Sequence, residues 1–435
     1  MEKLFIWVRL LVWPFAISDI EHKMKVDYNV NVQFLHERTD FDMKKIMLFE
    51  GDIETQGYFS IQLSEAFQKM GHETFIFDLS RPWDSTERFF RFYEEGNTVL
   101  INFNFHGMSG EEIFLDENDR MMWDALRIPC YNIVVDHPMY YHHFLEKHPK
   151  DYHHINIDRN HEKYMQRFFP EIINGPFLPL AGTQLYPNKS YVPAQYRRYD
   201  VTMVGNYTPP KQFEKYITRI DEEYTAFYYG MIDDLLAHPM RTVEEVAEEH
   251  IRREIPEVTE EEIKKVMSKL TFIDLYVRFM TRGRAVAALA DAGIKVHVFG
   301  GGWEKLECKK PENLINGNSL DSVGCLKKLC QSRISLNVMP WFRDGAHDRI
   351  FNSMLNGALC LTDSSVYLNE ILQDNVNCKI YSVANTEELP DMVGALLSNP
   401  VHLQEIIDNG YEMAKAAHTW EHRAVVLHDL IEKQC

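Results

Sequence analysis

The sequence predicts an α/β fold in which two Rossmann-like domains place parallel sheets on either side of a cleft. Two observations predict it. The chain has 435 residues, more than one hydrophobic core normally serves, so we expect two domains. Short runs of β-branched and aromatic residues also alternate with amphipathic helices. Strands separated by helices need crossover connections, and they therefore form parallel sheets with helices on both faces.

The first domain is predicted at residues 43–185. Its first strand, 46–49, leads through a loop into a helix whose Phe59, Leu63 and Phe67 share one face. Ligands of such sheets bind beyond the carboxyl ends of the strands, so the residues that follow each strand are candidates for a site. The same strand signal returns at 75–77, 99–103, 131–135 and 155–157.

The second domain is predicted at residues 199–410, after a Pro-, Asn- and Tyr-rich linker at 186–198. Within it, the region 211–292 is predicted to be a helical insertion, whose acidic run we interpret as a solvated helix face. Residues 411–435 are predicted to form a C-terminal helix. Strand signals of this domain occur at 200–204, 296–299, 334–338, 358–361 and 378–381.

Residues 1–42 are interpreted as an appendage to this fold. Their apolar stretch 4–17 resembles a signal peptide, but Arg9 interrupts it, and it is shorter than the about 20 apolar residues that span a bilayer. We therefore expect no membrane span. The seven cysteines follow no regular spacing, which indicates a reducing compartment and predicts a cytoplasmic protein.

The formal net charge of −19 argues against nucleic-acid binding. The acidic residues are spread along the chain, and a surface this negative repels a phosphate backbone. A small anionic ligand is still compatible with it, because basic groups and helix N-termini can hold phosphate locally. The sequence motifs of P-loop NTPases and α/β-hydrolases are absent from the chain.

The strongest chemical signal runs from Asn337 to Asp363. A strand ends near Pro340, a loop containing Gly345 follows, and a helix is expected to begin near Asp348. The free N–H groups of that helix start, with His347 and Arg349 beside it, suit a diphosphate. The alternative is an ordinary strand–helix turn in which Arg349 pairs with Asp344 or Asp348.

Two glycine turns add candidates for phosphate contact. Gly205 and Asn206 directly follow a strand, although simple turn chemistry explains them equally well. Gly301 lies in the turn 300–302, which lacks the G-x-G-x-x-G spacing of dinucleotide-binding folds. We interpret this turn as a close backbone approach, either to a nucleotide or to a neighbouring loop.

The segment Arg349–Asn352, followed by Gly-Ala-Leu-Cys-Leu-Thr-Asp at 357–363, resembles the CgeB-like (spore-maturation-protein type) glycosyltransferases of the family-1-type GT-B superfamily. The resemblance implies the GT-B fold and a metal-independent transfer of a hexosyl group to an unidentified acceptor hydroxyl. The co-substrate would be a nucleotide-sugar donor, no cofactor would be needed, and the acceptor would be a glycan, a protein or a small molecule. It extends to 135–138, 177–180, 199–206, 298–303 and 418–423.

The donor is expected in the C-terminal half. Asn352 departs from the pattern, because the family usually has a glutamate there that accepts from the ribose hydroxyls of the donor. Asparagine lacks that charge-assisted bond, so the exchange weakens donor binding, alters nucleotide preference or marks a less active member. The expected donor-binding residues are Gly205, Asn206, Gly301, His347, Arg349, Asn352 and Asp363.

Asp136 and His137, at the end of the strand 131–135, are the candidate catalytic residues. A carboxylate and an imidazole at a strand end can position an acceptor hydroxyl or act as a base. Glu50 and Asp52, after the first strand, are further candidates on the acceptor side. Alternatively, His137 shapes a turn before Pro138.

No metal site is expected. Histidines are dense between His137 and His161, but the chain lacks an H-E-x-x-H motif, a Cys/His ligand spacing and a D-x-D triplet. Two other functions stay open at this point. One is a sugar-nucleotide epimerase on the same architecture, and the other is a non-catalytic descendant that binds a glycan or a partner protein.

Overall fold

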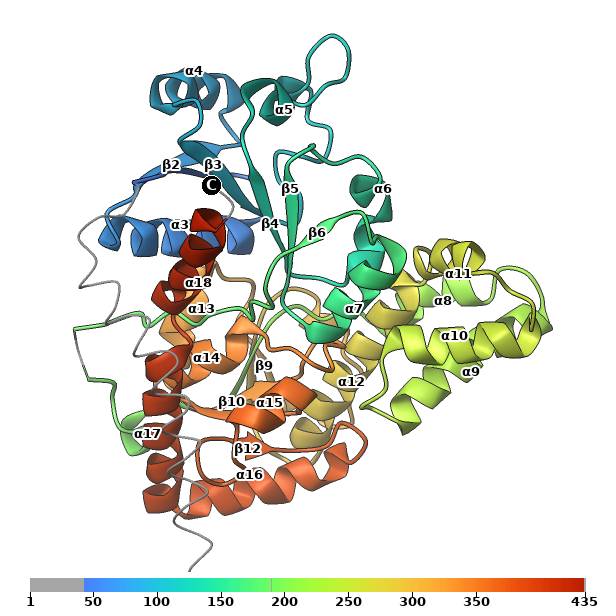
Figure 1. Ribbon diagram of the computed structural model, residues 1–435. Coiled ribbons are helices and arrows are strands. Elements are labelled where there is room, and N and C mark those ends of the chain that lie inside the picture. The colour runs from blue at the N-terminus through green and yellow to red at the C-terminus, as the bar shows by residue number, and fades with distance from the viewer. Residues whose placement is uncertain (1–42, 189, 434–435) are drawn as a thin grey trace, which may run out of the picture.

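The computed structural model describes residues 43–188 and 190–433, which form two α/β domains stacked one above the other (Figure 1). Each domain contains a six-stranded parallel sheet with helices around it. The predicted fold class is confirmed. The predicted appendage, residues 1–42, lies outside the described residues. Within the described ranges, no helix is both long and apolar enough to cross a membrane.

The N-terminal sheet is parallel throughout. Its strands are β1 (Lys45–Glu50), β2 (Glu73–Asp78), β3 (Thr98–Phe103), β4 (Cys130–Val134), β5 (Tyr152–Asn156) and β6 (Ile173–Asn174). They lie in the order β2-β1-β3-β4-β5-β6. Every residue of β3, β4 and β5 is buried, as expected for central strands covered on both faces. The sequence predicts the first five strands, whereas the two residues of β6 carry no periodic signal.

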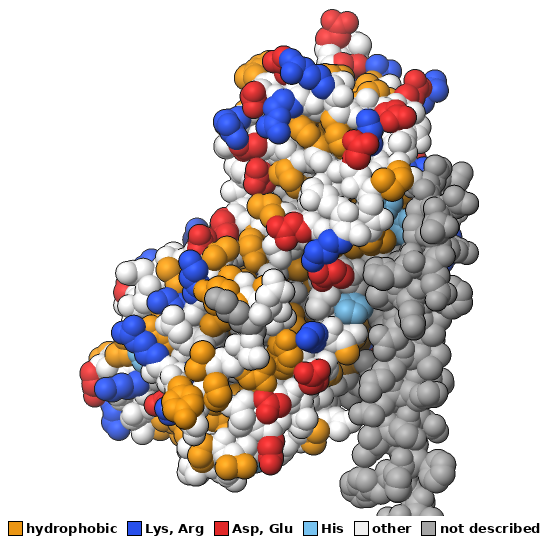
Figure 2. All heavy atoms as spheres, turned by 90° about the vertical axis from the view of Figure 1, so that its left-hand side faces the viewer, with side chains coloured by type: hydrophobic (Ala, Val, Ile, Leu, Met, Phe, Trp, Pro, Cys, Tyr) orange, Lys and Arg blue, Asp and Glu red, His pale blue; other side chains and the backbone are white. Residues whose placement is uncertain are grey.

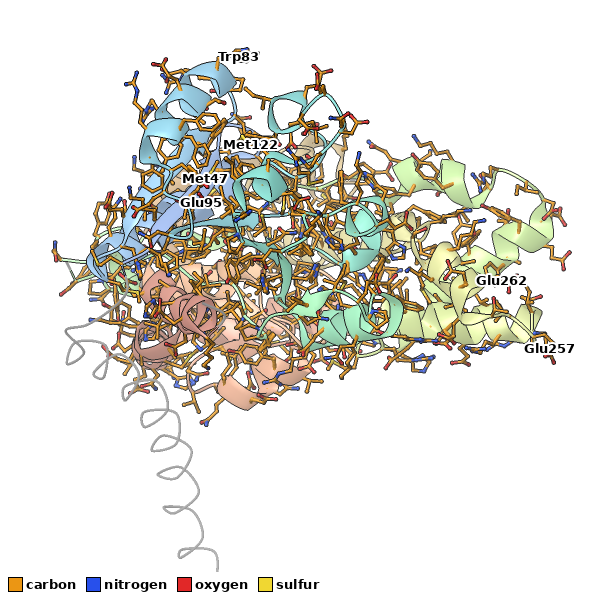
Figure 3. The ribbon with its side chains drawn as sticks, turned by 45° about the horizontal axis from the view of Figure 1, so that its top comes forward. Met47, Trp83, Glu95, Met122, Glu257 and Glu262 are labelled. Atoms are coloured by element: carbon orange, nitrogen blue, oxygen red, sulfur yellow. The ribbon has the colours of Figure 1, made fainter. Side chains whose placement is uncertain are left out.

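Helices cover both faces of this sheet. They are α3 (Glu54–Lys69), α4 (Pro82–Phe92), α5 (Met122–Leu126), α6 (His142–Leu145) and α7 (Arg159–Phe168), with 3-10 turns η1 (Glu112–Phe114) and η2 (Pro138–Tyr141). The buried face of α3 contains Phe59, Leu63 and Phe67, as predicted. On the outer side of α4, the Trp83 side chain is 80% exposed and projects from the domain (Figure 3).

The C-terminal sheet is also parallel, in the order β12-β11-β10-β7-β8-β9. Its strands are β7 (Tyr199–Val204), β8 (Val296–Phe299), β9 (Leu314–Asn316), β10 (Ser332–Asn337), β11 (Leu359–Thr362) and β12 (Lys379–Ile380). The short, partly exposed β9 is the one strand here that the sequence does not predict. The elements around the sheet are α13 (Ser322–Leu329), α14 (Asp348–Leu355), α15 (Val366–Ile371), α16 (Leu389–Ser398), η3 (Ala194–Tyr196), η5 (Trp303–Lys305), η6 (Pro311–Asn313) and η7 (Thr386–Glu388).

A helical insertion separates β7 from β8. It comprises η4 (Pro210–Phe213), α8 (Glu214–Ile217), α9 (Glu222–Ala237), α10 (Val243–Glu254), α11 (Glu260–Met267) and α12 (Thr271–Asp291). Capping boxes at Thr242 and Thr259 fix the starts of α10 and α11. Glu257 and Glu262 lie at the outer end of the insertion (Figure 3).

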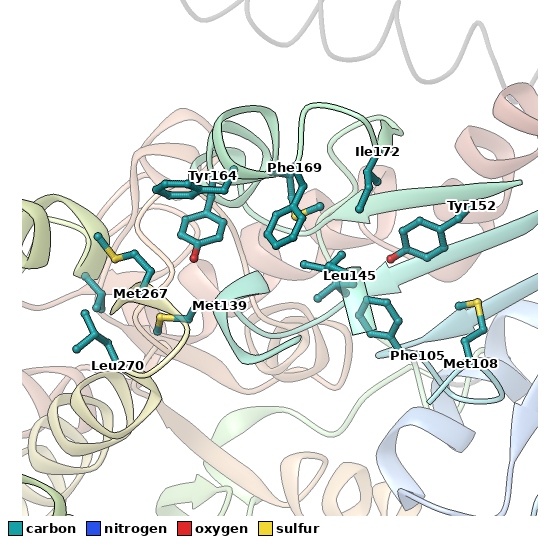
Figure 4. Close-up of a cluster of buried hydrophobic side chains, with 14 of the residues drawn as sticks. Phe105, Met108, Met139, Leu145, Tyr152, Tyr164, Phe169, Ile172, Met267 and Leu270 are labelled. Atoms are coloured by element: carbon teal, nitrogen blue, oxygen red, sulfur yellow. The ribbon is translucent and has the colours of Figure 1, made fainter. Parts of the chain in front are cut away.

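The insertion shares a hydrophobic core with the N-terminal domain. Met267 and Leu270 of the insertion belong to the same buried cluster as Met139 and Tyr164 of the N-terminal domain (Figure 4). Because a packed core transmits displacement, the insertion and the N-terminal domain are expected to move together.

The C-terminal region contains two helices where one was expected. α17 (Pro400–Ala417) ends at His418, and a capping box at Thr419 starts α18 (Trp420–Glu432). α18 runs in a different direction from α17, away from the C-terminal domain, and packs against α3 (Figure 1). There the Trp420 ring packs on the Phe59 ring, with 5.2 Å between their centroids. α18, far along the chain from α3, therefore completes the core of the first domain.

Candidate active site

A cavity of about 200 Å³ lies where the N-terminal end of α3 faces the carboxyl ends of the C-terminal strands. This is the position at which ligands bind in sheets of this kind. Five of the predicted site residues line it: Gly205, Asn206, His347, Arg349 and Asn352. The other predicted residues lie elsewhere. Residues of α3, of the β9–α13 loop and of α18 complete its wall.

A larger cavity of about 420 Å³ lies between α6 and α11, away from these strand ends. Its charged lining consists of Glu146, Glu261, Lys264 and Lys265, so its opposite charges balance. None of the predicted site residues belongs to its lining. The smaller cavity is therefore the candidate site.

The start of α14 presents Arg349 to the cavity. Its guanidinium donates from Nε to Asn337 Oδ1 (2.9 Å) and from Nη2 to the Val338 carbonyl (3.0 Å), and its Nη1 lies 3.0 Å from His347 Nε2. Asp344 pairs instead with Arg159, at 3.4 Å. The hydrogen-bond partners of Arg349 are thus neutral groups, whereas the alternative interpretation paired it with the carboxylate of Asp344 or Asp348.

Arg282 of α12 lies behind the wall of the cavity, and the sequence prediction missed it. It is buried behind the Gly205–Asn206 turn, where its Nη1 donates to the Asn206 carbonyl at 2.5 Å. Burial, together with the nearby charges of Arg349 and Arg278, lowers its pKa well below the usual value. A buried cation beside other cations is costly, and a bound anion would relieve the repulsion. The sequence carried one sign of this position. Arg282 is a charged residue on the same helix face as the apolar Val286 and Leu289, and that face is buried.

The glycine turn after β8 is explained by a neighbouring loop. A Cβ on Gly300 would collide with the Gly205 carbonyl, and the Gly301 N–H donates to Asn206 Oδ1 at 2.8 Å. Gly300 lines the cavity, whereas the N–H of Gly301 is engaged in this hydrogen bond. The turn therefore shapes the wall formed by Gly205 and Asn206.

Asn352 lines the cavity with both of its polar atoms already engaged. Its Oδ1 accepts from the Thr183 N–H at 2.8 Å, and its Nδ2 donates to Asp348 Oδ2 at 2.8 Å. Asp363, the last predicted donor residue, lies outside the cavity lining. Its carboxylate is buried against the Met339 N–H (2.7 Å) and Arg343 (3.5 Å), where it holds the end of β10.

Asp136 lies at the end of β4, outside the lining of the 200 Å³ cavity. Its carboxylate accepts from Asn104 Nδ2 (3.0 Å) and from the Tyr141 hydroxyl (3.2 Å), and it lies 3.8 Å from Arg278 of α12. These contacts connect the N-terminal sheet to the insertion.

His137 also contacts the insertion. Its Nδ1 accepts from the Met139 N–H at 3.0 Å, so the proton is on Nε2, which lies 3.2 Å from Glu244 of α10. The ring therefore caps η2, in agreement with the alternative that His137 shapes a turn. Asp52 lies 3.4 Å from His106 and, like Glu50, is absent from the cavity lining.

The wall on the acceptor side instead contains Glu54, Thr55 and Tyr58 of α3. Glu54 reaches across the cavity mouth, where its carboxylate accepts from the Ser322 N–H (2.8 Å) and from the Ser322 hydroxyl (3.0 Å). Burial raises the pKa of the Tyr58 phenol. The start of α3 is the part of the N-terminal domain that closes over the site.

Comparison with known proteins finds a similarity over part of the chain. Residues 282–429 match the family model described as "Glycosyl transferase-like". The matched range begins at Arg282 and includes Arg349 and Asn352. The predicted glycosyltransferase class is confirmed at this level. No curated protein matches the sequence.

Several solved glycosyltransferase structures are similar to the chain at low identity. HepE of Anabaena, in complex with UDP and glucose, is 9% identical with a TM-score of 0.48, over 90% of this chain and 99% of that one. Sucrose-phosphate synthase from Thermosynechococcus elongatus is 11% identical with a TM-score of 0.47, over the same shares. TarM is 10% identical with a TM-score of 0.42 over 77% of this chain, which spans 54% of the TarM length.

Proposed function

We propose that the protein is a nucleotide-sugar-dependent glycosyltransferase of the GT-B type and the CgeB-like subtype, with the donor bound in the cavity between α3 and the C-terminal sheet. The observation that carries the proposal is the pair Arg282 and Arg349 beside the N-terminal end of α14. Two cations and a helix start favour a diphosphate.

In the proposed transfer the acceptor hydroxyl oxygen bonds to the anomeric carbon and gives up its proton. The bond between the anomeric carbon and a diphosphate oxygen breaks, and its electron pair leaves with the nucleoside diphosphate. In this proposal Arg349, which lines the cavity, contacts that leaving group, and Arg282 raises the positive potential from behind the Gly205–Asn206 turn. Stabilisation of charge as it develops is a large term in catalysis, and it is stronger in a site without water. These arginines supply the charge, so the proposed transfer proceeds without a bound metal.

The donor has to enter an open form of this cleft. A volume of about 200 Å³ lies below the roughly 300–1,000 Å³ of typical ligand pockets. The contact between Glu54 and Ser322 closes the mouth in this structure. Separation of α3 from α13 admits the donor, and closure then excludes water from the reaction.

The remaining elements of the proposal concern partners and location. Over the face shown in Figure 2, basic and acidic side chains are interspersed, without a single large basic patch. Together with the net charge of −19, this supports an acceptor other than nucleic acid, namely a glycan, a protein or a small molecule. The cysteine pattern supports a cytoplasmic location.

Calorimetric titration with the diphosphates of uridine, guanosine, adenosine and thymidine tests the proposal. We expect at least one to bind more tightly than about 1 mM, and Arg349→Ala to weaken it at least about tenfold. Arg333→Ala is the matched control, since this arginine pairs with Asp200 on the surface. No binding of any diphosphate would refute the donor site.

A second candidate is a non-catalytic descendant that binds the donor without transfer, favoured by the engagement of both polar atoms of Asn352. Incubation with a donor labelled in the sugar distinguishes the outcomes. A labelled acceptor or free sugar supports transfer, and an epimerised donor indicates an epimerase. An unchanged donor that nevertheless binds supports the descendant.

A further inference from the structure

We propose that Asn352, Asp348 and His347 form one hydrogen-bonded chain that positions Arg349, so that Asn352 is a positioning residue of an active site. The proposal rests on the proposed function only in taking the diphosphate as the ligand of Arg349. The four residues lie within the first turns of α14 and all line the cavity.

The orientation of the Asn352 amide follows from its neighbours. The backbone N–H of Thr183 can only donate, so the atom that faces it at 2.8 Å is the carbonyl oxygen of Asn352. The amide nitrogen therefore faces Asp348 and donates to its Oδ2 at 2.8 Å. A glutamate at position 352 has no proton to donate, and its carboxylate would face that of Asp348.

The tautomer of His347 follows in the same way. Arginine nitrogens only donate, so His347 Nε2, 3.0 Å from Arg349 Nη1, is the acceptor. The ring proton is then on Nδ1, which lies against Asp348 Oδ1. The backbone N–H of Arg349 also points at Nδ1 but lies farther away, at 3.4 Å, and this tautomer leaves that long contact unused. Burial and the adjacent Arg349 lower the pKa of His347 to about 4, so the ring is neutral at pH 7.

Asp348 is thus shared by the two side chains. Its Oδ2 accepts from Asn352 Nδ2, its Oδ1 lies in close contact with His347 Nδ1, and it is buried at the start of α14. Asn352 in turn attaches this chain to Thr183, in the segment that joins the two domains. The position of Arg349 is therefore coupled to the contact between the domains.

This arrangement leaves Arg349 ready for a ligand. A guanidinium has five N–H donors, and Asn337, Val338 and His347 take one each. One N–H remains on each terminal nitrogen, and two such N–H groups can form a bidentate bond to phosphate. The chain fixes this fork before the ligand arrives and so lowers the entropy cost of binding.

Exchange of the two side chains tests the proposal. In Asp348→Asn the new amide nitrogen, itself a donor, faces either the Asn352 amide nitrogen or the His347 ring N–H, so two donors meet. In Asn352→Asp two carboxylates face each other. In the double variant, the carboxylate now at position 352 accepts from the Thr183 N–H and from the amide nitrogen now at position 348. The amide oxygen at position 348 accepts from the His347 ring. Every hydrogen bond is restored, and the charge has moved by one helical turn.

We expect each single variant to weaken binding of the best nucleoside diphosphate by about tenfold and the double variant to recover to within about threefold. Nitrogen-15 shifts of the His347 ring should show the Nδ1–H tautomer in the wild type and the double variant, and its loss in Asp348→Asn. Asp391→Asn, on the exposed first turn of α16, is the control.

The proposal would be overturned if the loss of binding free energy in the double variant equalled the sum of the losses in the two single variants. An Nε2–H tautomer of His347 in the wild type would also overturn it. Thermal unfolding of each variant identifies a loss that comes from misfolding. The ring shifts need no ligand. If the wild type shows the expected tautomer and binds no diphosphate, the positioning chain stands and the proposed donor site fails.

Discussion

Asp158 of the N-terminal domain accepts a hydrogen bond of 2.8 Å from the backbone N–H of Asp344 in the C-terminal domain. Asp158 is fully buried, and its backbone forms a β-bridge with Gly345. The loop 341–347, which leads to the start of α14, is therefore held from across the cleft.

Replacement of Asp158 by asparagine is expected to change how stability depends on pH. Burial raises the pKa of Asp158 from 3.8 to about 6. A raised carboxyl pKa gives a stabilising contribution that is complete below about pH 4 and lost as the pH rises through 6. The wild type should therefore gain about 2 kcal/mol over Asp158→Asn between pH 7 and pH 4. Urea unfolding across this range measures it, and a pH-independent difference would contradict it.

Gly345→Ala is expected to destabilise the domain contact. A Cβ at this position would collide with the Ile157 carbonyl and lie 2.9 Å from the Asp158 Cα, both backbone atoms that cannot turn away. We expect a cost of about 1–3 kcal/mol in the free energy of unfolding. Gly394→Ala in α16 is the control, because no atom lies within 4 Å of its added Cβ, and it should stabilise by about 0.5–1 kcal/mol. Equal effects would contradict the assigned close approach.

Arg282→Met is expected to separate stability from binding. Arg282 is a buried cation that lies beside other cations, so its removal should stabilise the ligand-free protein by about 1–4 kcal/mol while weakening diphosphate binding. Arg343→Met should act in the opposite direction, because it leaves the buried carboxylate of Asp363 unpaired. Thermal unfolding and calorimetry measure both. Destabilisation by Arg282→Met would indicate a structural role.

Glu54→Ala is expected to accelerate release of the nucleoside diphosphate about tenfold, because it removes both bonds to Ser322. Glu54→Gln can keep both bonds and loses only the charge at the start of α13, worth about 0.3–1 kcal/mol. Its release rate should therefore lie between those of the wild type and Glu54→Ala. Stopped-flow displacement measures the rates, and identical rates for all three would contradict closure by this contact.

The sequence predicted the strands that carry a repeated apolar signal, and it missed those that do not. The runs 46–49 and 334–338 became β1 and β10, since consecutive buried β-branched and aromatic residues identify a central parallel strand. β6 and β9 have only two and three residues, and tertiary pairing alone defines them. The break between α17 and α18 depends on a capping box at Thr419, which a helical period does not reveal.

The candidate site was predictable in its C-terminal half. The rule that ligands bind at strand ends brought Gly205, Asn206, His347 and Arg349 to one cavity. The same rule placed Asp136 and His137 at a strand end, but α12 and α10 contact them there. These contacts join residues more than 100 positions apart, which local patterns do not encode. Their proposed catalytic role stays a prediction.

The position of α18 also has a consequence for the order of synthesis. α3 and β3 leave the ribosome early, yet the apolar surface around Phe59 is completed by Trp420 and Leu427. At about 5–20 residues per second, the roughly 330 residues in between need on the order of 20–60 s. The nascent first domain must spend that time with part of its core exposed, within reach of chaperones and of neighbouring chains. Its release as a finished fold depends on the synthesis of α18.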